Sequence, residues 1–505
     1  MYTYLKNRPM LLSAVLGSAL ALFTFYCPNA SVITGAAFIA LFFIMVIKRA
    51  KPEIIFSIFC VVMIIINLQL TLQRADSADL LSGSTLNGSF CITENPVDHG
   101  DYESFTAEAR DCAELKNGTK VFMFYGGDET LCMGDLIECD AKLKSVSKSD
   151  FKAGNYAENI YLSANIKNIA VKSGAQDKAL FNLSRLQRGI TNTLFENLST
   201  DESATLNAIV TGDKSYISPE FESCVRGAGI SHVLVVSGMH LSIIMTFIMG
   251  LLERFIYNRY AKPLIMFAVT VFLMALCGFT MSVVRSGVTY MLIAVSLLIG
   301  RTGERSNTLG AAVTLILLFS PFAILSISLQ LSVLSTFGVL AVSPAVMNAV
   351  CERVNIKNSL AFSVLSLAVS SVCASLMTMP VVILVFGYVS VVAVISNIII
   401  APIVTVSLIA AFCGLVLSLI SPVIAKPCFL VSGITAKYFN FMTEHIGGWK
   451  YSAVNVSRPF AVISVIVIFA VLQLLLYCRK RRDMLKLYGL NEKIKAEGGD
   501  RLIWR

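Results

Sequence analysis

Residues 229–242 read GISHVLVVSGMHLS, an apolar run that contains several polar side chains. His232 and His240 are two of only four histidines in the chain, and Ser237 and Gly238 lie between them. On a helix with 100° per residue, His240 lies about 80° and Ser237 about 140° from His232. The three polar side chains then share less than half of the helix circumference. Such a helix is expected to turn its polar face toward protein or water rather than lipid.

The rest of the chain is strongly apolar as well. Of its 505 residues, 56% are hydrophobic and only 14% are charged, whereas a soluble domain has about 25% charged residues. We therefore expect a polytopic α-helical membrane protein. The first apolar run, LLSAVLGSALALFTFYC, is interpreted as a retained span rather than a cleaved signal peptide, because further spans follow at once. The formal charge of +9 is attributed first to cytoplasmic loops and only second to an anionic substrate.

Hydrophobic stretches long enough to cross a bilayer predict about 12 spans. Basic segments fall on alternate loops, all of which become cytoplasmic in this layout. The predicted spans are 10–27, 30–47, 54–72, 232–252, 263–282, 284–300, 306–320, 322–347, 359–379, 384–400, 402–421 and 459–478. Residues 426–450 are predicted to form an external amphipathic stretch.

Residues 73–175 form a polar insertion that this layout places outside the cytoplasmic membrane. Five short β-type runs alternate with turn signals: GSFCIT, ESFTAEA, TKVFMFY, DLIECDAKL and NIYLSANI. They predict a small closed β-barrel, of which the OB-type barrel is one case. Four cysteines cluster there, and an oxidising location would allow one or two disulfides among them. They are Cys91, Cys112, Cys132 and Cys139.

The expected domain order follows from these segments. It comprises 1–72 as an N-terminal membrane hairpin and third span, 73–175 as the extracytoplasmic OB-like β domain, 176–228 as amphipathic or interfacial helices, 229–478 as a polytopic membrane domain, and 479–505 as a basic cytoplasmic tail. Within the third region, 178–198 has apolar residues at helical spacing. Such a helix fits the membrane interface and fits packing on protein almost as well.

Arg285 is the only charged residue well inside the predicted spans of 230–478. It lies beside Ser282 and Ser286, and a charge near the middle of a membrane normally faces the bundle interior. Gln330 and Asn397 are milder cases. One polar pathway surrounded by these helices is the simplest common explanation. Two alternatives stay open: buried Ser and His can simply tie helices together, and Arg285 at a helix end can snorkel to headgroups.

Catalytic and metal-binding explanations receive less support. Ser237 and His240 are three residues apart and can meet, but there is no G-x-S-x-G elbow and no carboxylate in that span to orient the histidine. Two histidines without a nearby Cys, Asp or Glu make a poor zinc site. The segment VTGDKS lacks the frame of a phosphate-binding loop. We therefore expect no catalytic residues, no metal and no cofactor.

Five segments, in order, resemble motifs of the ComEC family, the membrane channels that take up transforming DNA in bacteria. The stretch at 229–242 resembles that family's Ser-Gly-x-His signature. The matching positions are Thr211, Gly212 and Asp213 upstream; Gly229, His232, Ser237, Gly238 and His240; Gly278, Ser282, Arg285 and Ser286; Gln330, Leu331 and Ser332; and Asn397 and Pro402. The end of the polar insertion resembles the family's OB-type domain. The chain lacks the His-x-His-x-Asp-His pattern of the nuclease-like domain found in many members, so it resembles the channel part only.

The resemblance implies transport of single-stranded DNA across the bacterial cytoplasmic membrane during natural competence, with the barrel receiving the strand. It implies membrane lipids, an outer DNA receptor, a cytoplasmic ATPase and a separate nuclease as partners, and leaves a homo-oligomer open. Two other functions are kept: a transporter of another anionic or lipid-linked substrate, and a Ser/His membrane hydrolase.

Overall fold

The computed structural model of the chain describes residues 8–27, 52–112, 114–127, 131–147, 151–171, 177–300, 303–351 and 358–468, with a few isolated residues between these ranges. The predicted span 30–47, the end of the span 459–478 and the tail 479–505 lie outside the described residues. The described part divides into a larger unit, residues 8–333 and 390–453, and a smaller one built from 334–389 and from 454 onward.

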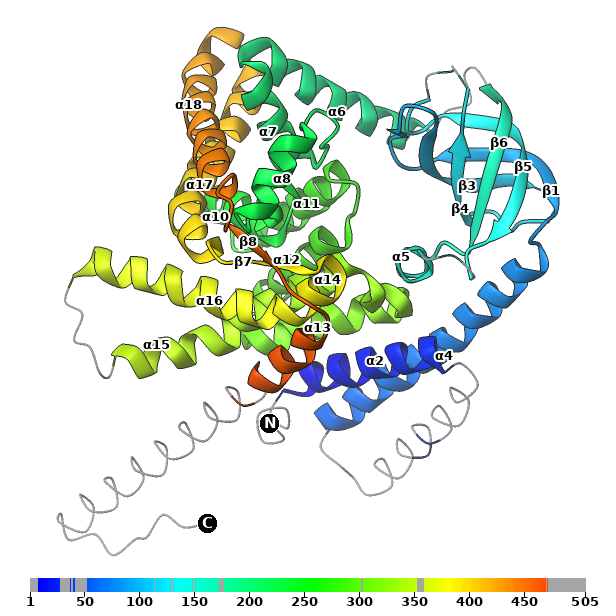
Figure 1. Cartoon of the computed structure of the whole chain (residues 1–505), viewed down its shortest axis with the longest axis horizontal. Helices are drawn as coiled ribbons and strands as arrows, with labels where there is room; N and C mark the ends of the chain where they lie inside the picture. Colours follow the sequence, from blue (N-terminus) through cyan, green and yellow to red (C-terminus); the bar gives the residue numbers. More distant parts are fainter. Residues whose placement is uncertain are drawn as a thin grey trace, which may run out of the picture. The chain divides into compact units, whose positions relative to one another are not determined.

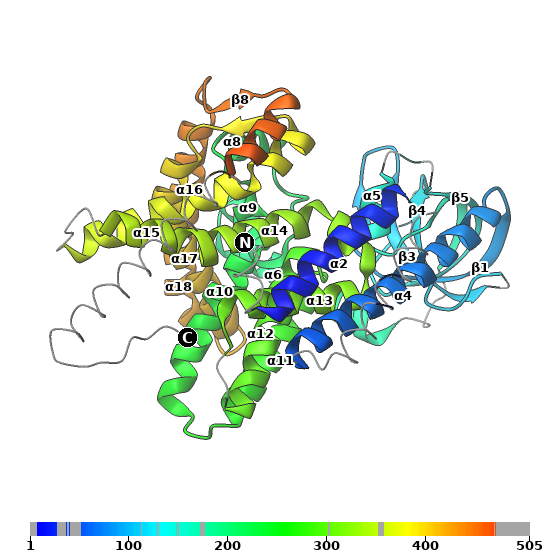
Figure 2. The same ribbon diagram turned by 90° about the horizontal axis from the view of Figure 1, so that it is seen from below.

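Three helices of the larger unit run side by side in the same direction. They are α2 (Pro9–Tyr26), α4 (Pro52–Leu80) and α13 (Arg305–Phe319) (Figures 1 and 2). At their starts, Arg8 forms an ion pair with Glu304 at 2.6 Å and the Ser57 hydroxyl donates to the Pro9 carbonyl. Further along, Asn67 Nδ2 in the middle of α4 donates to the Leu318 carbonyl near the end of α13 at 2.6 Å. The N-termini of all three helices therefore lie on one side of this bundle.

The polar insertion is a closed five-stranded barrel, as its alternating pattern predicts. The strands are β1 (Thr85–Ile92), β3 (Glu103–Cys112), β4 (Lys120–Tyr125), β5 (Leu136–Ser145) and β6 (Leu162–Val171), with a short edge strand β2 (Val97–Asp98). The pairing order is β1-β5-β6-β4-β3, and a further β1–β3 pairing closes the barrel. The β4–β6 pair is parallel and the others are antiparallel. Five strands with this mixed pairing fit the OB type of barrel.

The barrel rests on the membrane helices through the short helix α5 (Lys152–Ala157), which lies between β5 and β6. It packs on η2 (Pro321–Leu325), the 3₁₀ turn that follows α13. Phe322 is fully buried and its ring lies 5.9 Å from that of Phe25 and 5.8 Å from that of Tyr156. Ser320 accepts a hydrogen bond from Asn159 at 3.1 Å. Aromatic packing and this polar contact thus fix the barrel to α2 and η2.

After the barrel, α6 (Lys178–Asn197) confirms the helix that periodicity predicts at 178–198. Two of its polar residues, Arg185 and Arg188, are exposed, while Leu194 is fully buried. The next helices of the larger unit are α7 (Thr200–Thr211), α8 (Pro219–Gly227), α9 (Ser231–Leu234), α10 (Gly238–Phe255), α11 (Ala261–Leu276) and α12 (Met281–Ile299). They are followed by α13, η2 and α14 (Ile327–Phe337), and later by α17 (Ala393–Ser418) and α18 (Pro422–Gly447).

One predicted boundary near the end of the chain is wrong. The spans expected at 384–400 and 402–421 are one helix, α17, that continues through Pro402. A proline removes one backbone hydrogen bond and can bend a helix, yet α17 continues past Pro402. Helix α18 packs closely along α17 because α17 has small residues in the contact; Gly414, for example, lies against the Phe429 ring. The stretch expected at 426–450 as an amphipathic segment is most of this long helix α18.

The smaller unit contains the π-helical turn η3 (Gly338–Val342), α15 (Ser343–Cys351) and α16 (Ser359–Phe386). The strands β7 (Tyr388–Ser390) and β8 (Ala453–Asn455) flank its boundary. Gly338 lies so near the Cys373 carbonyl that an added Cβ would be 2.8 Å from its oxygen, and Ser343 hydrogen-bonds Ser370 at 3.0 Å. Close helix packing of this kind is typical of membrane bundles.

By length and composition, seven helices of the described residues can cross a membrane: Pro9–Tyr26, Pro52–Leu80, Gly238–Phe255, Met281–Ile299, Ile327–Cys351, Ser359–Phe386 and Ala393–Ser418. Three shorter apolar helices are Ala261–Leu276, Arg305–Phe319 and Pro459–Ile468. The chain is thus mostly helical with one β-barrel, and the predicted total of about 12 spans stays a prediction.

Candidate polar site in the membrane domain

The segment 229–242 is not one helix, so the shared polar face expected from 100° spacing is wrong. Helix α9 ends at Leu234, Val235 is extended, and α10 begins at Gly238 with Ser237 as its N-cap. Ser237 has the extended backbone that an N-cap residue needs, because its side chain must fold back onto the first turn. The propensity of Ser-Gly to start a helix therefore overrides the continuous apolar pattern around it.

Ser237 and His240 meet in a capping box at the start of α10. The Ser237 N–H donates to His240 Nδ1 at 3.0 Å, and the Ser237 hydroxyl oxygen lies 3.2 Å from the same nitrogen. The hydroxyl oxygen also accepts a hydrogen bond from the Met239 N–H at 3.3 Å. His240 takes the place that Glu or Gln usually fills in this motif. Because Nδ1 accepts the backbone N–H, the neutral ring carries its proton on Nε2.

His240 is 1% exposed, and its Nε2 has no hydrogen-bond partner among the described residues. A buried polar atom without a partner costs about 1–3 kcal/mol. The Nε2–H therefore presents an unsatisfied donor inside the membrane domain.

Arg285 lies in the second turn of α12 and is 6% exposed. Its Nε donates to the Ser332 hydroxyl at 2.8 Å, and its Nη2 donates to the Ser286 hydroxyl at 2.7 Å. Among the described residues no carboxylate forms an ion pair with it. Arginine stays protonated in proteins, so among the described residues the side-chain partners of this buried guanidinium are neutral hydroxyl groups.

Helices α10 and α12 meet at Gly238. A Cβ built on Gly238 would lie 2.5 Å from Arg285 Nη2 and closer still to the Ser286 hydroxyl. The start of α10 can therefore approach Arg285 only because position 238 has no side chain. Ser282 also joins this group, because its hydroxyl donates to Ser332 at 3.1 Å.

Three sequence motifs thus converge: Ser-Gly-x-His on α10, Ser-x-x-Arg-Ser on α12, and Ser332 on α14. We call the residues Ser237, Gly238, His240, Ser282, Arg285, Ser286 and Ser332 the polar cluster. Gln330 was expected in this pathway, but its side-chain amide donates to the Ile324 carbonyl at 2.8 Å and stabilises η2. Ser332, two residues on, contacts the arginine instead; its position in the Gln-Leu-Ser motif was the available signal.

The other expected residues lie on neighbouring elements. His232 is exposed on α9, and Asn397 is half-buried on α17. Gly229 has a positive φ of 73°, and an added Cβ would lie 2.6 Å from that of Ala393, so the start of α17 lies against this segment.

The Thr-Gly-Asp segment closes helix α7. Gly212 is its C-cap with a φ of 88°, a left-handed conformation that favours glycine. The Thr211 hydroxyl donates to the Asn207 carbonyl at 2.8 Å, and Asp213 accepts two hydrogen bonds from Ser215. A Cβ on Gly212 would lie 3.4 Å from Val236. This segment therefore terminates a helix next to the α9–α10 break, a role that its resemblance to a phosphate loop does not predict.

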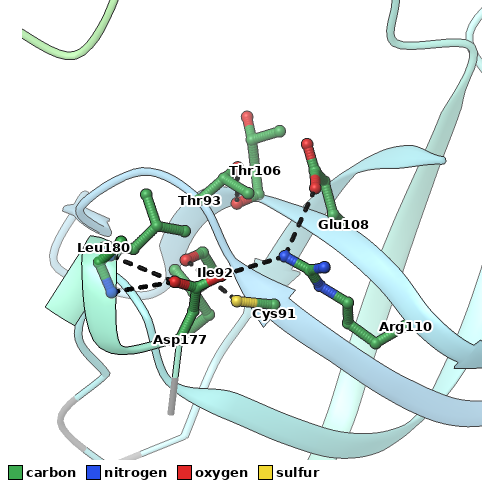
Figure 3. A network of polar contacts seen from close by, with 9 residues as sticks. Cys91, Ile92, Thr93, Thr106, Glu108, Arg110, Asp177 and Leu180 are labelled. Atoms are coloured by element: carbon green, nitrogen blue, oxygen red, sulfur yellow. Dashed lines mark hydrogen bonds and ion pairs between the residues drawn. The ribbon is translucent and has the colours of Figure 1, made fainter. Parts of the chain in front are cut away.

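The four barrel cysteines are free thiols in this structure. Cys91 lies near an ion pair in which Arg110 contacts Asp177, the residue that caps α6, at 3.2 Å (Figure 3). Cys112 and Cys139 are the cross-strand neighbours of Gly88 on its two sides. Burial raises the pKa of the Cys139 thiol to about 12. The expected disulfides remain a prediction.

No group of three or more His, Cys, Asp or Glu side chains suited to a metal ion occurs within the described ranges.

Comparison with known proteins adds two findings. The Competence protein family matches residues 209–481, which is more than half of the chain. The ComE operon protein 3 of Bacillus subtilis (strain 168) is 21% identical over 292 residues. This match covers 58% of the present chain and 36% of the relative, so the chain spans well under two thirds of that protein. No solved structure matches the chain significantly.

Proposed function

The chain belongs to the competence protein family, in agreement with the resemblance seen in its motifs, and from this premise we propose that it carries single-stranded DNA across the cytoplasmic membrane. The observation that supports the proposal most is the polar cluster. Family-typical motifs from three helices place a buried guanidinium and an unsatisfied histidine donor in one region of an otherwise apolar domain.

These groups suit transient rather than tight binding of a phosphate. Arg285 has no carboxylate partner among the described residues, so a strand phosphate would supply the missing negative charge. Hydroxyl groups of Ser282, Ser286 and Ser332 offer neutral hydrogen bonds around it. A single fixed charge favours conduction, because several would bind the strand too tightly to release it.

The proposed sidedness rests on charge and on helix direction. The N-termini of α2, α4 and α13 lie together, and basic residues precede or begin each: Lys6 and Arg8, Lys48 to Lys51, and Arg301 and Arg305. Basic flanks favour the cytoplasm. The barrel follows the opposite end of α4, which favours an extracytoplasmic position for it. We therefore keep 73–175 as an external domain and 229–478 as the conducting domain.

Partners are proposed from the same premise. The described residues show no recognisable nucleotide site, so we propose that a separate ATPase drives the strand, that an outer receptor delivers it, and that a separate nuclease prepares it. A homo-oligomer around one path would be detected by cross-linking the chain in a membrane.

One observation favours a second candidate, a membrane hydrolase. The Ser237 hydroxyl lies 3.2 Å from His240 Nδ1, as in a nucleophile–base pair. However, the same nitrogen accepts the Ser237 backbone N–H, so its lone pair is already used by the helix cap. If Ser237 were a nucleophile, a serine-reactive phosphonate would label the wild type but not Ser237→Ala; as a cap, Ser237 gives no labelling.

The direct test replaces Arg285 by alanine in a transformable host in which this chain is the only copy. We expect labelled DNA to bind the cell surface as before but not to enter the cytosol. Arg188→Ala, which removes an exposed arginine on α6, is the matched control and should leave entry unchanged. Normal entry in correctly inserted Arg285→Ala would reject the site, and normal entry without the gene would reject the function.

A further inference from the structure

Four aromatic rings form a continuous stripe on the outer surface of the barrel. The His99 ring stacks on Tyr102 at 4.8 Å between centroids, Tyr102 contacts Phe124 at 5.8 Å, and Phe124 contacts Phe122 at 5.0 Å. Tyr102 is 42% exposed. We call these four residues the aromatic stripe; it runs from the β2–β3 hairpin onto β4.

On this face His99 and Tyr102 are exposed, whereas Phe122 and Phe124 are half-buried. On β4 the side chains of Val121, Met123 and Tyr125 are buried, and those between them point outward. The registers place Phe122 between Thr106 and Ser163.

Phe124 lies in the same way between Ser104 and Asn165. None of these four neighbours is large enough to cover a phenyl ring. The stripe is therefore a sheet face on which the aromatic rings contact one another and stay partly exposed beside small or polar neighbours.

The barrel that carries the stripe is acidic, although the whole chain is basic. Residues 85–171 contain fourteen Asp or Glu and eight Lys or Arg, a formal charge of −6. Asp98 and Asp101 lie in or beside the hairpin that holds His99 and Tyr102. The cations of this face lie away from the hairpin: Lys120 is opposite Glu108 across the strands, and Lys142 and Lys144 on β5 are opposite Asn165 and Ser163.

The pKa of a neighbouring carboxyl reports the same negative field. Burial and the adjacent Asp98 raise the pKa of Glu103 at the start of β3. An acidic surface repels the phosphates of a nucleic acid, whose binding depends on Lys and Arg. By contrast, aromatic faces and carboxylates together attract Lys and Arg side chains.

We propose that the aromatic stripe docks a cationic segment of a partner protein rather than the DNA strand. Lys or Arg side chains of that segment lie over Tyr102, Phe124 and Phe122, and Asp98 and Asp101 pair with further cations. This goes beyond the channel function and does not depend on it. It assigns to the barrel the recruitment of a basic protein, although the OB-type fold alone would predict strand binding.

The test uses the full chain in neutral-lipid nanodiscs and a fluorescent oligoarginine peptide, followed by anisotropy. Tyr102→Ser and Phe124→Ser should each weaken binding roughly two- to fivefold, as expected for an exposed cation–π contact. Asp98→Asn with Asp101→Asn should weaken it as well and leave the rings in place. Phe151→Ser removes an exposed aromatic outside the stripe, and Asp140→Asn an exposed acid on β5; both should leave binding unchanged.

Labelled oligothymidylate is the competing probe. Peptide binding that falls in the stripe variants and is retained in the two controls supports the proposal. Three results overturn it: oligothymidylate binding that is lost in Phe124→Ser, peptide binding equal in all variants, or no peptide binding by the wild type. DNA entry is not measured here, so failure of this docking site and failure of the channel are distinguishable.

Discussion

Replacing Gly238 by alanine tests whether α10 and α12 meet at the polar cluster. The new methyl group would lie 2.5 Å from Arg285 Nη2, against the Ser286 hydroxyl and 3.3 Å from Ser286 Cβ. Arg285 has limited freedom to retreat, because its Nε is bound to Ser332 and its Nη2 to Ser286. The variant must therefore separate the helices or break the bond between Arg285 and Ser286.

The magnitude follows from these two routes. Overpacking a well-packed core costs about 1–3 kcal/mol, and losing a hydrogen bond to a charged group costs about 1.5–3 kcal/mol. Alanine at the first helical position returns at most about 1 kcal/mol of helix propensity. After subtracting this gain from the smaller of the two costs, we expect Gly238→Ala to lower the free energy of unfolding by up to about 2 kcal/mol.

The assay is thermal stability of a fluorescent-protein fusion by size-exclusion chromatography in detergent. Gly250→Ala in the same helix is the matched control, because nothing lies within 4 Å of a Cβ there, and it should be neutral or stabilising. Adding Ser286→Ala to Gly238→Ala removes the closest contact and should restore part of the loss. If Gly238→Ala and Gly250→Ala are equally stable, the contact between the two helices is wrong.

Three further predictions concern the barrel and its seat on the membrane helices. Phe322→Ala should destabilise the protein by about 3–5 kcal/mol, the usual loss for a buried phenyl ring, whereas Phe319→Ala, at an 83% exposed position, should have little effect. Equal losses in the two variants would contradict the packing of Phe322 between the barrel and α2. Because burial raises the pKa of Cys139 to about 12, iodoacetamide at neutral pH should modify it only after unfolding, as followed by mass spectrometry, and rapid labelling of the folded protein would refute its burial. The pKa of Glu103 is raised above its ordinary 4.5, so the folded state binds this proton more tightly and loses stability as the pH rises from 4.5 through the pKa of the folded state. Glu103→Gln should therefore be more heat-stable than wild type at neutral pH, unlike Asp140→Asn. A pH profile of thermal stability that is unchanged in Glu103→Gln would contradict the raised pKa.

The barrel was predictable because its strands follow simple rules. The runs around Met123 and Ile137 alternate between buried and more exposed positions, and those around Phe90 and Phe105 are buried more continuously; each forms a strand with these side chains in the core. Closure into a barrel followed from the number of short strands and their turns. The pairing order, including the parallel β4–β6 pair, is a long-range property that no local pattern encodes.

The membrane domain was harder to predict because apolar periodicity says little there. The same hydrophobic run fits one helix or two, so the break at Ser237 and the continuity through Pro402 were both missed. The helix cap explains the break at Ser237, because Ser-Gly-x-His is readable as a capping box once histidine is accepted as the acceptor at the third position. The burial of Arg285 and of His240 agreed with expectation. That Ser332 rather than Gln330 contacts Arg285 depends on which face of α14 meets α12.

The central claim is that a strand passes the polar cluster, and trapping the strand there tests it most directly. Ser332→Cys is combined with single-stranded DNA whose backbone carries thiol-reactive groups, offered to competent cells, and Val295→Cys at a 43% exposed position of α12 serves as the control. The account predicts a covalent adduct at position 332 above the background of the native cysteines, and none at 295. Adducts at neither position, or equally at both, would contradict it.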